Sequence, residues 1–525
     1  MRDFHVPGRS EVYATNGMCA TSHPLAANVA IDILKRGGNA MDAAIAGAVL
    51  LGICEPQMTG IGGDCFVLFS PSGSEEILSL NGSGRAPTAA NAEDLRSSGL
   101  TAIPLTGPEA VTVPGAIDAF CHLLDAHGKI GLDAVLQPAI HYAEEGVPVA
   151  PRVAFDWADK ADTLQGVARH HYLRNDQPLK TGDVFRSPGQ AEVLRRIARH
   201  GREAFYAGEV ADDMITALSE RGGKHSAEDF AQARCTWTDP VVSPYVDVEL
   251  VEHPPNGQGA TANLLLNILS HFDLQALDPL GSQRVHLEAE ATKLAYDARN
   301  RFIADPDHVT ALNHMLSPAT ARNLANLIDP KRAMPSAAAL TESVHKDTVY
   351  ITVVDRDRMA VSLIYSIYHG FGSGIASEKF GILLQNRGAG FTLQRGHPNE
   401  YGPGKRPMHT IIPGMLRRNG RVDMPFGVMG GAYQPTGHAR LVSNLVDFSM
   451  DLQQAFDAPR AFTDAGVLKL ERGFSDSVYQ ELADLGHTIE SPHAPLGGAQ
   501  AIRILEGGVL EAASDSRKDG CALGY

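Results

Sequence analysis

The chain has 525 residues, a charged fraction of 20% and a formal net charge of −16. This length accommodates two or more conventional domains, or one large core with insertions, and the ordinary hydrophobic content predicts a folded globular protein. The acidic balance argues against a nucleic-acid or anionic-membrane partner, but it permits an anionic small-molecule substrate that is held by a local basic clamp.

The first residues contain no apolar core of the signal-peptide type, and the longest apolar run, 43–54, is too short to span a bilayer. We therefore expect a cytoplasmic protein. The six cysteines are scattered without a Cys-x-x-Cys pair, which indicates reduced thiols rather than a disulfide framework or a zinc site. Neither a metal nor an organic cofactor is expected.

Two helices are predicted near the N-terminus. Ser22 suits the N-cap of the first helix, which ends at Gly37-Gly38. The second helix, 40–53, is apolar almost all round, which predicts a buried helix. The Gly-rich turn 60–63 follows a helix and precedes a strand, so close backbone packing explains it better than phosphate binding does. The middle of the chain, 107–333, is predicted to be largely helical.

Residues 346–374 predict a β-hairpin with Thr348 at the start of its first strand. The first run of β-branched and aromatic residues ends before a polar turn, and a second run covers 360–366. If the chain is cut between Asp347 and Thr348, Thr348 gains a free amine that can act as the base for its own hydroxyl. From these residues alone, a Thr that opens an ordinary strand is the simpler interpretation.

The pair Gly430-Gly431 ends a short predicted strand ahead of a helical stretch. Consecutive glycine N–H groups at a helix entrance suit an oxyanion hole, because both amides can point at one developing negative charge. A Gly-Gly pair alone is weak evidence for such a site.

A set of short motifs runs through nearly the whole chain in a fixed order. It comprises Leu34-Lys35-Arg36-Gly37-Gly38-Asn39-Ala40-Met41-Asp42-Ala43-Ala44, Gly60-Ile61-Gly62-Gly63, Ala295-Tyr296, Arg299, Asp305-Pro306, Thr348, Val353-Val354-Asp355, Phe371-Gly372-Ser373-Gly374, Lys405-Arg406-Pro407, Gly430-Gly431 and Ala458-Pro459-Arg460. With this set, the chain resembles the γ-glutamyltransferase family of N-terminal nucleophile hydrolases. The resemblance implies an α+β fold, a four-layer αββα sandwich.

The resemblance also implies self-cleavage before Thr348. The products would be a large subunit, 1–347, and a small subunit, 348–525, which remain associated as a heterodimer. Two such heterodimers could also associate with each other. The implied chemistry is acyl transfer, in which the Thr348 hydroxyl attacks an amide carbonyl and its own amine moves the proton.

Three further residues have implied catalytic roles. The amides of Gly430 and Gly431 would hold the oxyanion, and Ser366 would hydrogen-bond the nucleophile. Water or an acceptor amine would then release the acyl group from the enzyme.

The recognition residues depart from the family pattern. Ser83 stands where the family has the Arg that clamps the donor's α-carboxylate, and Ala389-Gly390 replaces the Asp that accepts its α-amino group. Tyr368 replaces an Asn, and His409-Thr410 replaces a pair of Ser residues. Losing the clamp and its partner removes charge-assisted bonds of roughly 1.5–3 kcal/mol each.

This variant pattern resembles the acylase branch of the family, which includes cephalosporin-acylase-like proteins and oxamate amidohydrolase. On this basis Arg85 and Arg387 are predicted to bind a substrate carboxylate, and Tyr368, His409 and Thr410 to shape the pocket. An ordinary structural role is the alternative for each arginine.

The leading hypothesis is a self-processing amidohydrolase or acyltransferase with a small amide substrate, carboxylate-bearing and not γ-glutamyl. The nearest rival is a γ-glutamyltransferase or glutathione hydrolase that recognises its donor with other groups. An uncleaved, non-catalytic binding protein is the rival of a different class, and the retained Thr348, Ser366, Gly430 and Gly431 argue against it. A nucleotide-binding protein is the weakest alternative, since no Gly-rich loop has the required neighbours.

Overall fold

The computed structural model describes residues 5, 8–335 and 348–525. Two seven-stranded antiparallel sheets form its centre. The first sheet runs in the order β19 (Cys521–Gly524), β2 (Met18–Thr21), β10 (Val349–Val354), β11 (Ala360–Ser366), β3 (Asp64–Ser70), β4 (Leu78–Gly82) and β7 (Thr236–Thr238). The second runs in the order β1 (Val12–Ala14), β18 (Leu510–Ser514), β17 (Gly498–Ile504), β13 (Arg421–Met429), β12 (Gly414–Arg418), β9 (Val248–Glu252) and β8 (Val241–Tyr245).

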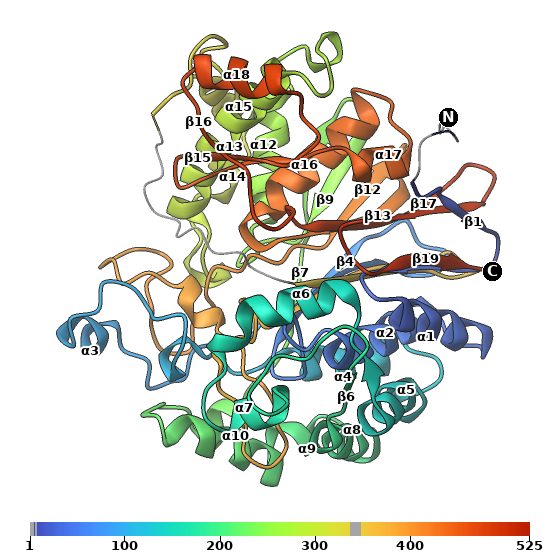
Figure 1. Ribbon diagram of the computed structural model, residues 1–525, viewed down its shortest axis with the longest axis vertical. Coiled ribbons are helices and arrows are strands. Elements are labelled where there is room, and N and C mark those ends of the chain that lie inside the picture. Colours follow the sequence, from blue (N-terminus) through green and yellow to red (C-terminus); the bar gives the residue numbers. More distant parts are fainter. Residues whose placement is uncertain (1–4, 6–7, 336–347) are drawn as a thin grey trace.

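Helices cover the outer face of each sheet, so that the molecule has four layers (Figure 1). On the side of the first sheet lie α1 (Pro24–Lys35), α2 (Ala40–Cys54), α4 (Ala116–His127) and α5 (Leu132–Glu145), together with α6 (Pro151–Lys160), α7 (Val167–Tyr172), α8 (Pro188–His200), α9 (Glu203–Tyr206), α10 (Glu209–Ser219) and α11 (Ala227–Ala231). The other side holds α12 (Gly259–Leu269), α13 (Ser282–Phe302), α14 (Leu312–Met315), α15 (Pro318–Ala325), α16 (Gln434–Val446), α17 (Leu452–Asp457) and α18 (Asp476–Asp484). The predicted αββα sandwich is confirmed.

Smaller elements extend this frame. A three-stranded sheet joins β14 (Ala461–Asp464), β15 (Val467–Leu470) and β16 (Thr488–Glu490), a two-stranded one joins β5 (Val147–Pro148) and β6 (Val184–Phe185), and the short helix α3 (Ala92–Ser97) lies at one side (Figure 1). Among the described residues, no helix combines the length and the apolar content that a membrane span requires.

The predicted N-terminal helices are present, with one correction at a cap. Helix α1 is capped by His23, whose Nδ1 accepts from the Leu25 N–H, whereas the Ser22 hydroxyl donates to Glu55 at 2.5 Å. Helix α2 has the expected bounds within one residue, and a capping box between Asn39 and Asp42 fixes its start. All of its residues are buried. The prediction at Ser22 was wrong because a buried carboxylate competes for its hydroxyl.

The Gly-rich turn confirms close backbone packing. A Cβ atom at Gly62 would lie 2.1 Å from the Leu383 carbonyl oxygen, and one at Gly63 would lie 2.5 Å from the Ser366 carbonyl oxygen. Neither position has room for a side chain. The turn therefore lets the loop after β11 approach the start of β3.

The middle of the chain is less uniformly helical than the sequence suggests. Strand β8 ends the second sheet beside β9, and β7 ends the first. Strand β8 alternates buried and exposed residues, with Val241, Ser243 and Tyr245 facing inward. These short edge strands interrupt a region of strong helix signals, which explains why the sequence alone did not reveal them.

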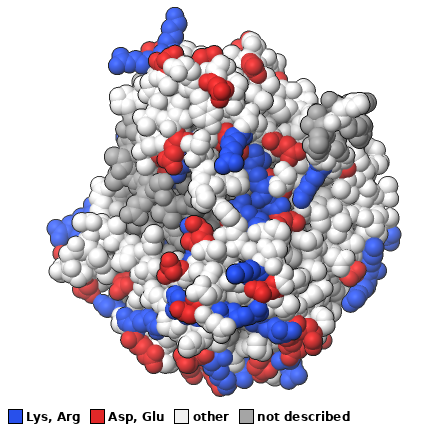
Figure 2. All heavy atoms as spheres, viewed as in Figure 1, with Lys and Arg blue, Asp and Glu red and all other residues white. Residues whose placement is uncertain are grey.

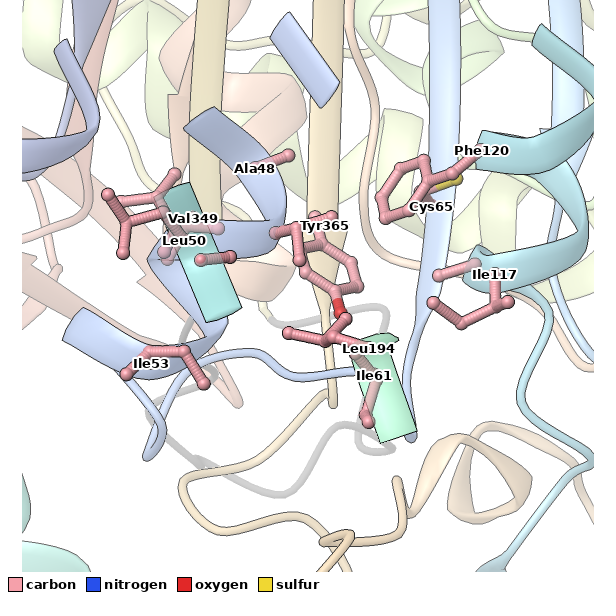
Figure 3. Close-up of a cluster of buried hydrophobic side chains, with 14 of the residues drawn as sticks. Ala48, Leu50, Ile53, Ile61, Cys65, Ile117, Phe120, Leu194, Val349 and Tyr365 are labelled. Carbon is pink, nitrogen blue, oxygen red and sulfur yellow. The ribbon is translucent and has the colours of Figure 1, made fainter. Parts of the chain in front are cut away.

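The predicted hairpin is confirmed as β10 and β11, in which Val349 is paired with Tyr365. These two strands lie between β2 and β3, in the interior of the first sheet. Val349 and Tyr365 contribute to one apolar cluster with the side chains of α2 and α4 (Figure 3). The hairpin is thus anchored to the helical layer as well as to its neighbouring strands.

Glycine at position 427 of β13 lets the two sheets approach each other. A Cβ atom there would lie 2.4 Å from ring atoms of Tyr350 in β10.

We expect Gly427→Ala to destabilise the fold by about 1–3 kcal/mol, as overpacking does in closed cores. The readout is the midpoint of thermal unfolding. The matched variant Gly507→Ala, in an exposed turn with no neighbour within 4 Å, should stay close to the wild type. Equal midpoints for the two variants would contradict this packing.

Candidate active site

Strand alternation directs the candidate nucleophile into the space between the sheets. Successive side chains of a strand point to opposite faces. Val349 and Tyr365 face the helices, whereas Tyr350 and its cross-strand partner Ile364 pack toward Met429 of the second sheet. Thr348 precedes Val349, so its side chain belongs to the inter-sheet side, and the residue is buried at 1% exposure.

The Thr348 hydroxyl lies next to Ser366, as the sequence predicts. It donates to Ser366 Oγ at 3.3 Å, from the other strand of the hairpin. Ser366 Oγ also accepts from the Tyr368 N–H at 2.8 Å and from Arg387 Nη2 at 3.1 Å. Tyr368 adopts a φ of +84°, which is unusual for a bulky side chain, and this turn directs its N–H at Ser366.

Arg387 connects several of the predicted substrate-binding residues. Its guanidinium donates to Thr410 Oγ1 at 2.9 Å and stacks over the Tyr368 ring, 4.1 Å from the centroid. Burial lowers the pKa of Arg387 to about 10, so the group stays protonated at neutral pH. Its positive charge next to Ser366 would stabilise a negative charge on the neighbouring Thr348 oxygen.

His409 belongs to a buried polar cluster around Asp64. Burial lowers the pKa of His409 well below its ordinary value, so the neutral ring donates from Nε2 to Asp64 at 3.2 Å. Asp64 also accepts from Gln385 and from the Gly84 and Gly115 N–H groups. Burial raises the pKa of Asp64 to about 6, against the opposing effect of Arg387 and these hydrogen bonds.

The glycine pair stands at the end of β13, as the sequence predicts. Gly430 has a φ of +120°, and Gly431 opens a short 3-10 turn that leads into α16. Gly430 lines a cavity of about 180 Å³ together with Thr348. The remaining lining residues come from α6, from the end of β13 and the turn after it, from the β14–β15 hairpin, from the loop before β17 and from the loop before β19: Arg152, Phe155, Asp156, Asp159, Lys160, Met429, Ala432, Tyr433, Phe462, Asp464, Lys469, His493, Ala494, Pro495, Leu496, Gly497 and Lys518.

The structure does not bring Arg85 into this constellation. The Arg85 side chain is 41% exposed, pairs with Asp305 at 3.3 Å and donates to the Gly404 carbonyl. Neither Arg85 nor Arg387 lines the cavity that Thr348 lines. The roles given to both arginines stay predictions, and Asp347 lies outside the described residues.

Sequence reasoning missed Asp64 and the charged wall of the cavity. Asp64 directly follows the Gly-rich turn, and a carboxylate at the start of an apolar strand is a signal that could have indicated it. Lys469 and Lys518 come from the last 60 residues and have no motif around them. Nothing in the sequence places these two lysines beside Thr348.

One group of side chains among the described residues could hold a metal ion, namely His286, Glu290 and His487. The Glu290 carboxylate already accepts from Lys293 Nζ at 2.6 Å and from the Met334 N–H at 2.8 Å. His286 Nδ1 and His487 Nε2 hydrogen-bond each other at 2.8 Å. These contacts satisfy the candidate ligand atoms without a metal, so the cluster is a buried polar network.

Comparison with known proteins agrees with the fold. The family model described as gamma-glutamyltranspeptidase matches residues 26–525. The chain belongs to the gamma-glutamyltranspeptidase family.

Its relatives include several amide-cleaving proenzymes. The chain is 35% identical to the glutathione hydrolase-like YwrD proenzyme of Bacillus subtilis, over 98% of this chain and 99% of that protein. It is 34% identical to the oxamate amidohydrolase proenzyme of Klebsiella pneumoniae, with the same coverage. The crystal structure of a cephalosporin acylase from Bacillus halodurans matches with a TM-score of 0.92 at 38% identity, over 100% of this chain and 99% of that one. The chain is therefore an enzyme of this hydrolase family, and the proenzyme relatives support self-processing.

Arg387 offers a direct test of the arrangement around Ser366. We expect Arg387→Met to slow both self-cleavage and amide turnover by about tenfold or more, because Ser366 and Thr410 each lose a charge-assisted bond. Precursor conversion on denaturing gels and kcat measure the two effects. The matched variant Arg301→Met removes a largely exposed arginine paired with Asp297 and should change neither rate. Cleavage of Arg387→Met at the wild-type rate would rule out this role.

Proposed function

We propose that the protein is a self-processing amidohydrolase in which Thr348 is the nucleophile. The observation that carries the proposal is the buried Thr348 hydroxyl, 3.3 Å from Ser366 and on the wall of the same cavity as Gly430. Cleavage before Thr348 would release an amine on the same residue as the hydroxyl. That amine would take the hydroxyl proton as the oxygen attacks the amide carbonyl.

In this mechanism, groups around Thr348 would stabilise the negative charge that develops on oxygen during the reaction. The Gly430 and Gly431 N–H groups would donate to the oxyanion of the tetrahedral intermediate. Ser366, held by Arg387 and the Tyr368 N–H, would stabilise the attacking oxygen. The protonated amine would then give its proton to the leaving nitrogen, and water or an amine would release the acyl group.

The strand order supports a stable two-chain enzyme after cleavage. Strands β10 and β11 of the proposed small subunit, 348–525, lie between β2 and β3 of the proposed large subunit, 1–347. In the second sheet, β12 of the small subunit pairs with β9 of the large one. Separation of the subunits would break backbone ladders in both sheets, so we propose a heterodimer that stays assembled.

We further propose that the acyl donor is not a γ-glutamyl group. Ser83, at the position of the family's donor-binding Arg, is buried and bonded to Asn81 and Asn256. Ala389 and Gly390, in place of the Asp that would receive the α-amino group, offer no side-chain acceptor. A donor ammonium at that point would lose water without gaining a carboxylate partner.

A pair of chromogenic amides tests the donor directly. Glutaryl para-nitroanilide differs from γ-glutamyl para-nitroanilide only in lacking the α-amino group. We expect kcat/KM for the γ-glutamyl compound to be no higher than for the glutaryl compound. A γ-glutamyl preference of about tenfold or more, the size of one charge-assisted bond, would instead establish the alternative, a glutathione hydrolase with other recognition groups.

The nucleophile itself is tested by trapping the acyl-enzyme. Acid quenching during turnover should leave the acyl mass on the fragment that begins with Thr348. An adduct on another residue would exclude Thr348. A chain that remains whole and inert would favour the non-catalytic alternative.

A further inference from the structure

The cavity beside Thr348 contains a buried lysine from the C-terminal end of the chain. Lys518 lines this cavity, and the residue is only 5% exposed. Its aliphatic chain passes over Gly498, where a Cβ atom would lie 2.7 Å from the lysine Cγ. The missing side chain at Gly498 thus leaves the room that Lys518 occupies.

Every lysine, arginine and aspartate of the cavity wall except Lys518 forms an ion pair with another residue of the wall. Arg152 pairs with Asp156 at 2.8 Å, Lys160 with Asp159 at 2.5 Å, and Lys469 with Asp464 at 3.2 Å. These three pairs include every lysine and arginine of the lining other than Lys518, and every carboxylate of the lining. Within the described parts of the chain, the Lys518 ammonium has no ion pair. Figure 2 shows Lys and Arg side chains near the centre of one face, above α6, with Asp and Glu side chains around them.

Two further carboxyl groups near Lys518 form hydrogen bonds with other residues. Burial raises the pKa of Glu55 to about 7, even though the charge of Lys518 acts in the opposite direction, and Glu55 accepts from Ser22. A carboxyl with this pKa is partly protonated at neutral pH and neutralises Lys518 only in part. Asp519 accepts from the Arg152 and Val153 N–H groups at the start of α6. Neither carboxyl group forms an ion pair with Lys518 among the described residues, so the lysine has no salt-bridge partner at the cavity.

We propose that Lys518 binds a carboxylate at the far end of the substrate's acyl group. This inference rests on the proposed function, because it takes the acyl group to be carried on Thr348. A buried ammonium without a counter-ion is costly, and a carboxylate in the cavity provides both the charge and the hydrogen-bond acceptor.

The cavity also limits the size and the position of the group that it holds. Its volume of about 180 Å³ lies below the 300–1,000 Å³ or so of sites for drug-sized ligands, so a short acyl chain fits. The acyl group stays on the nucleophile through both half-reactions, whereas the leaving amine must depart. The charged cavity is therefore assigned to the acyl group and not to the leaving group.

A carboxylate and its uncharged isostere test the role of Lys518. The substrates are glutaryl para-nitroanilide and the same anilide with the terminal carboxylate replaced by a carboxamide. In the wild type we expect kcat/KM to favour the carboxylate by about tenfold or more. In Lys518→Met this ratio should fall to near one, and Lys518→Arg should retain most of it. Lys224→Met, which alters an exposed lysine paired with Asp94 outside the cavity, should keep the wild-type ratio.

Inhibition provides a measurement without any substitution. The monoamide of glutaric acid should inhibit the wild type about tenfold or more better than the diamide does, because only the monoamide offers a carboxylate to Lys518. Equal inhibition by the two compounds, no preference of the wild type for the carboxylate substrate, or an unchanged ratio in Lys518→Met would each overturn the role of Lys518. A preference that follows a carboxylate on the leaving amine would overturn the assignment to the acyl side.

Failure of the proposed function is distinguishable from failure of this inference. Self-cleavage into two fragments and turnover of the carboxamide substrate report on the nucleophile without involving Lys518. If the wild type shows both but no carboxylate preference, only the inference fails. If the wild type shows neither, the proposed function fails, and the inference fails with it.

Discussion

The position of the Thr348 hydroxyl depends on the strand that follows it. Strand β10 is hydrogen-bonded on both sides and packed on both faces, so its register cannot shift without moving a row of buried side chains. Val349 is held against α2, and this fixes Thr348 on the opposite face, toward the second sheet. The two sheets therefore position the hydroxyl more rigidly than a loop would.

Around this fixed point, the parts with a proposed catalytic role and the parts with a proposed role in substrate recognition have different origins. Ser366 comes from the neighbouring strand and Gly430 from the facing sheet, which are the elements that build the fold itself. The charged cavity wall comes from α6, from β14–β15 and from loops near the C-terminus. Recognition can thus change while the hydroxyl, its serine partner and the glycine turn stay in place. Such a separation is consistent with near-full-length matches to relatives with different names: a glutathione hydrolase-like proenzyme, an oxamate amidohydrolase proenzyme and a cephalosporin acylase.

Much of the frame could be predicted from local patterns. The β10–β11 hairpin follows from two runs of β-branched residues, and α2 from an apolar stretch with an asparagine at its start. The cap of α1 could not be predicted, because Ser22 bonds to Glu55, more than thirty residues away in the sequence. The surroundings of Asp64 and Lys518 likewise depend on segments brought together only by the fold. A sequence shows which side chains are present, but the pairing of buried charges is set by tertiary structure.

Intact mass spectrometry of the purified wild type beside Thr348→Ala tests the central claim most directly. The account predicts two wild-type fragments, 1–347 and 348–525, and a single full-length chain for the variant, because only the wild type carries the hydroxyl at this position. Control digestion with an added protease would show whether both proteins are folded. A folded wild-type chain that remains whole, or a variant that is cut at the same bond and rate, would contradict the account.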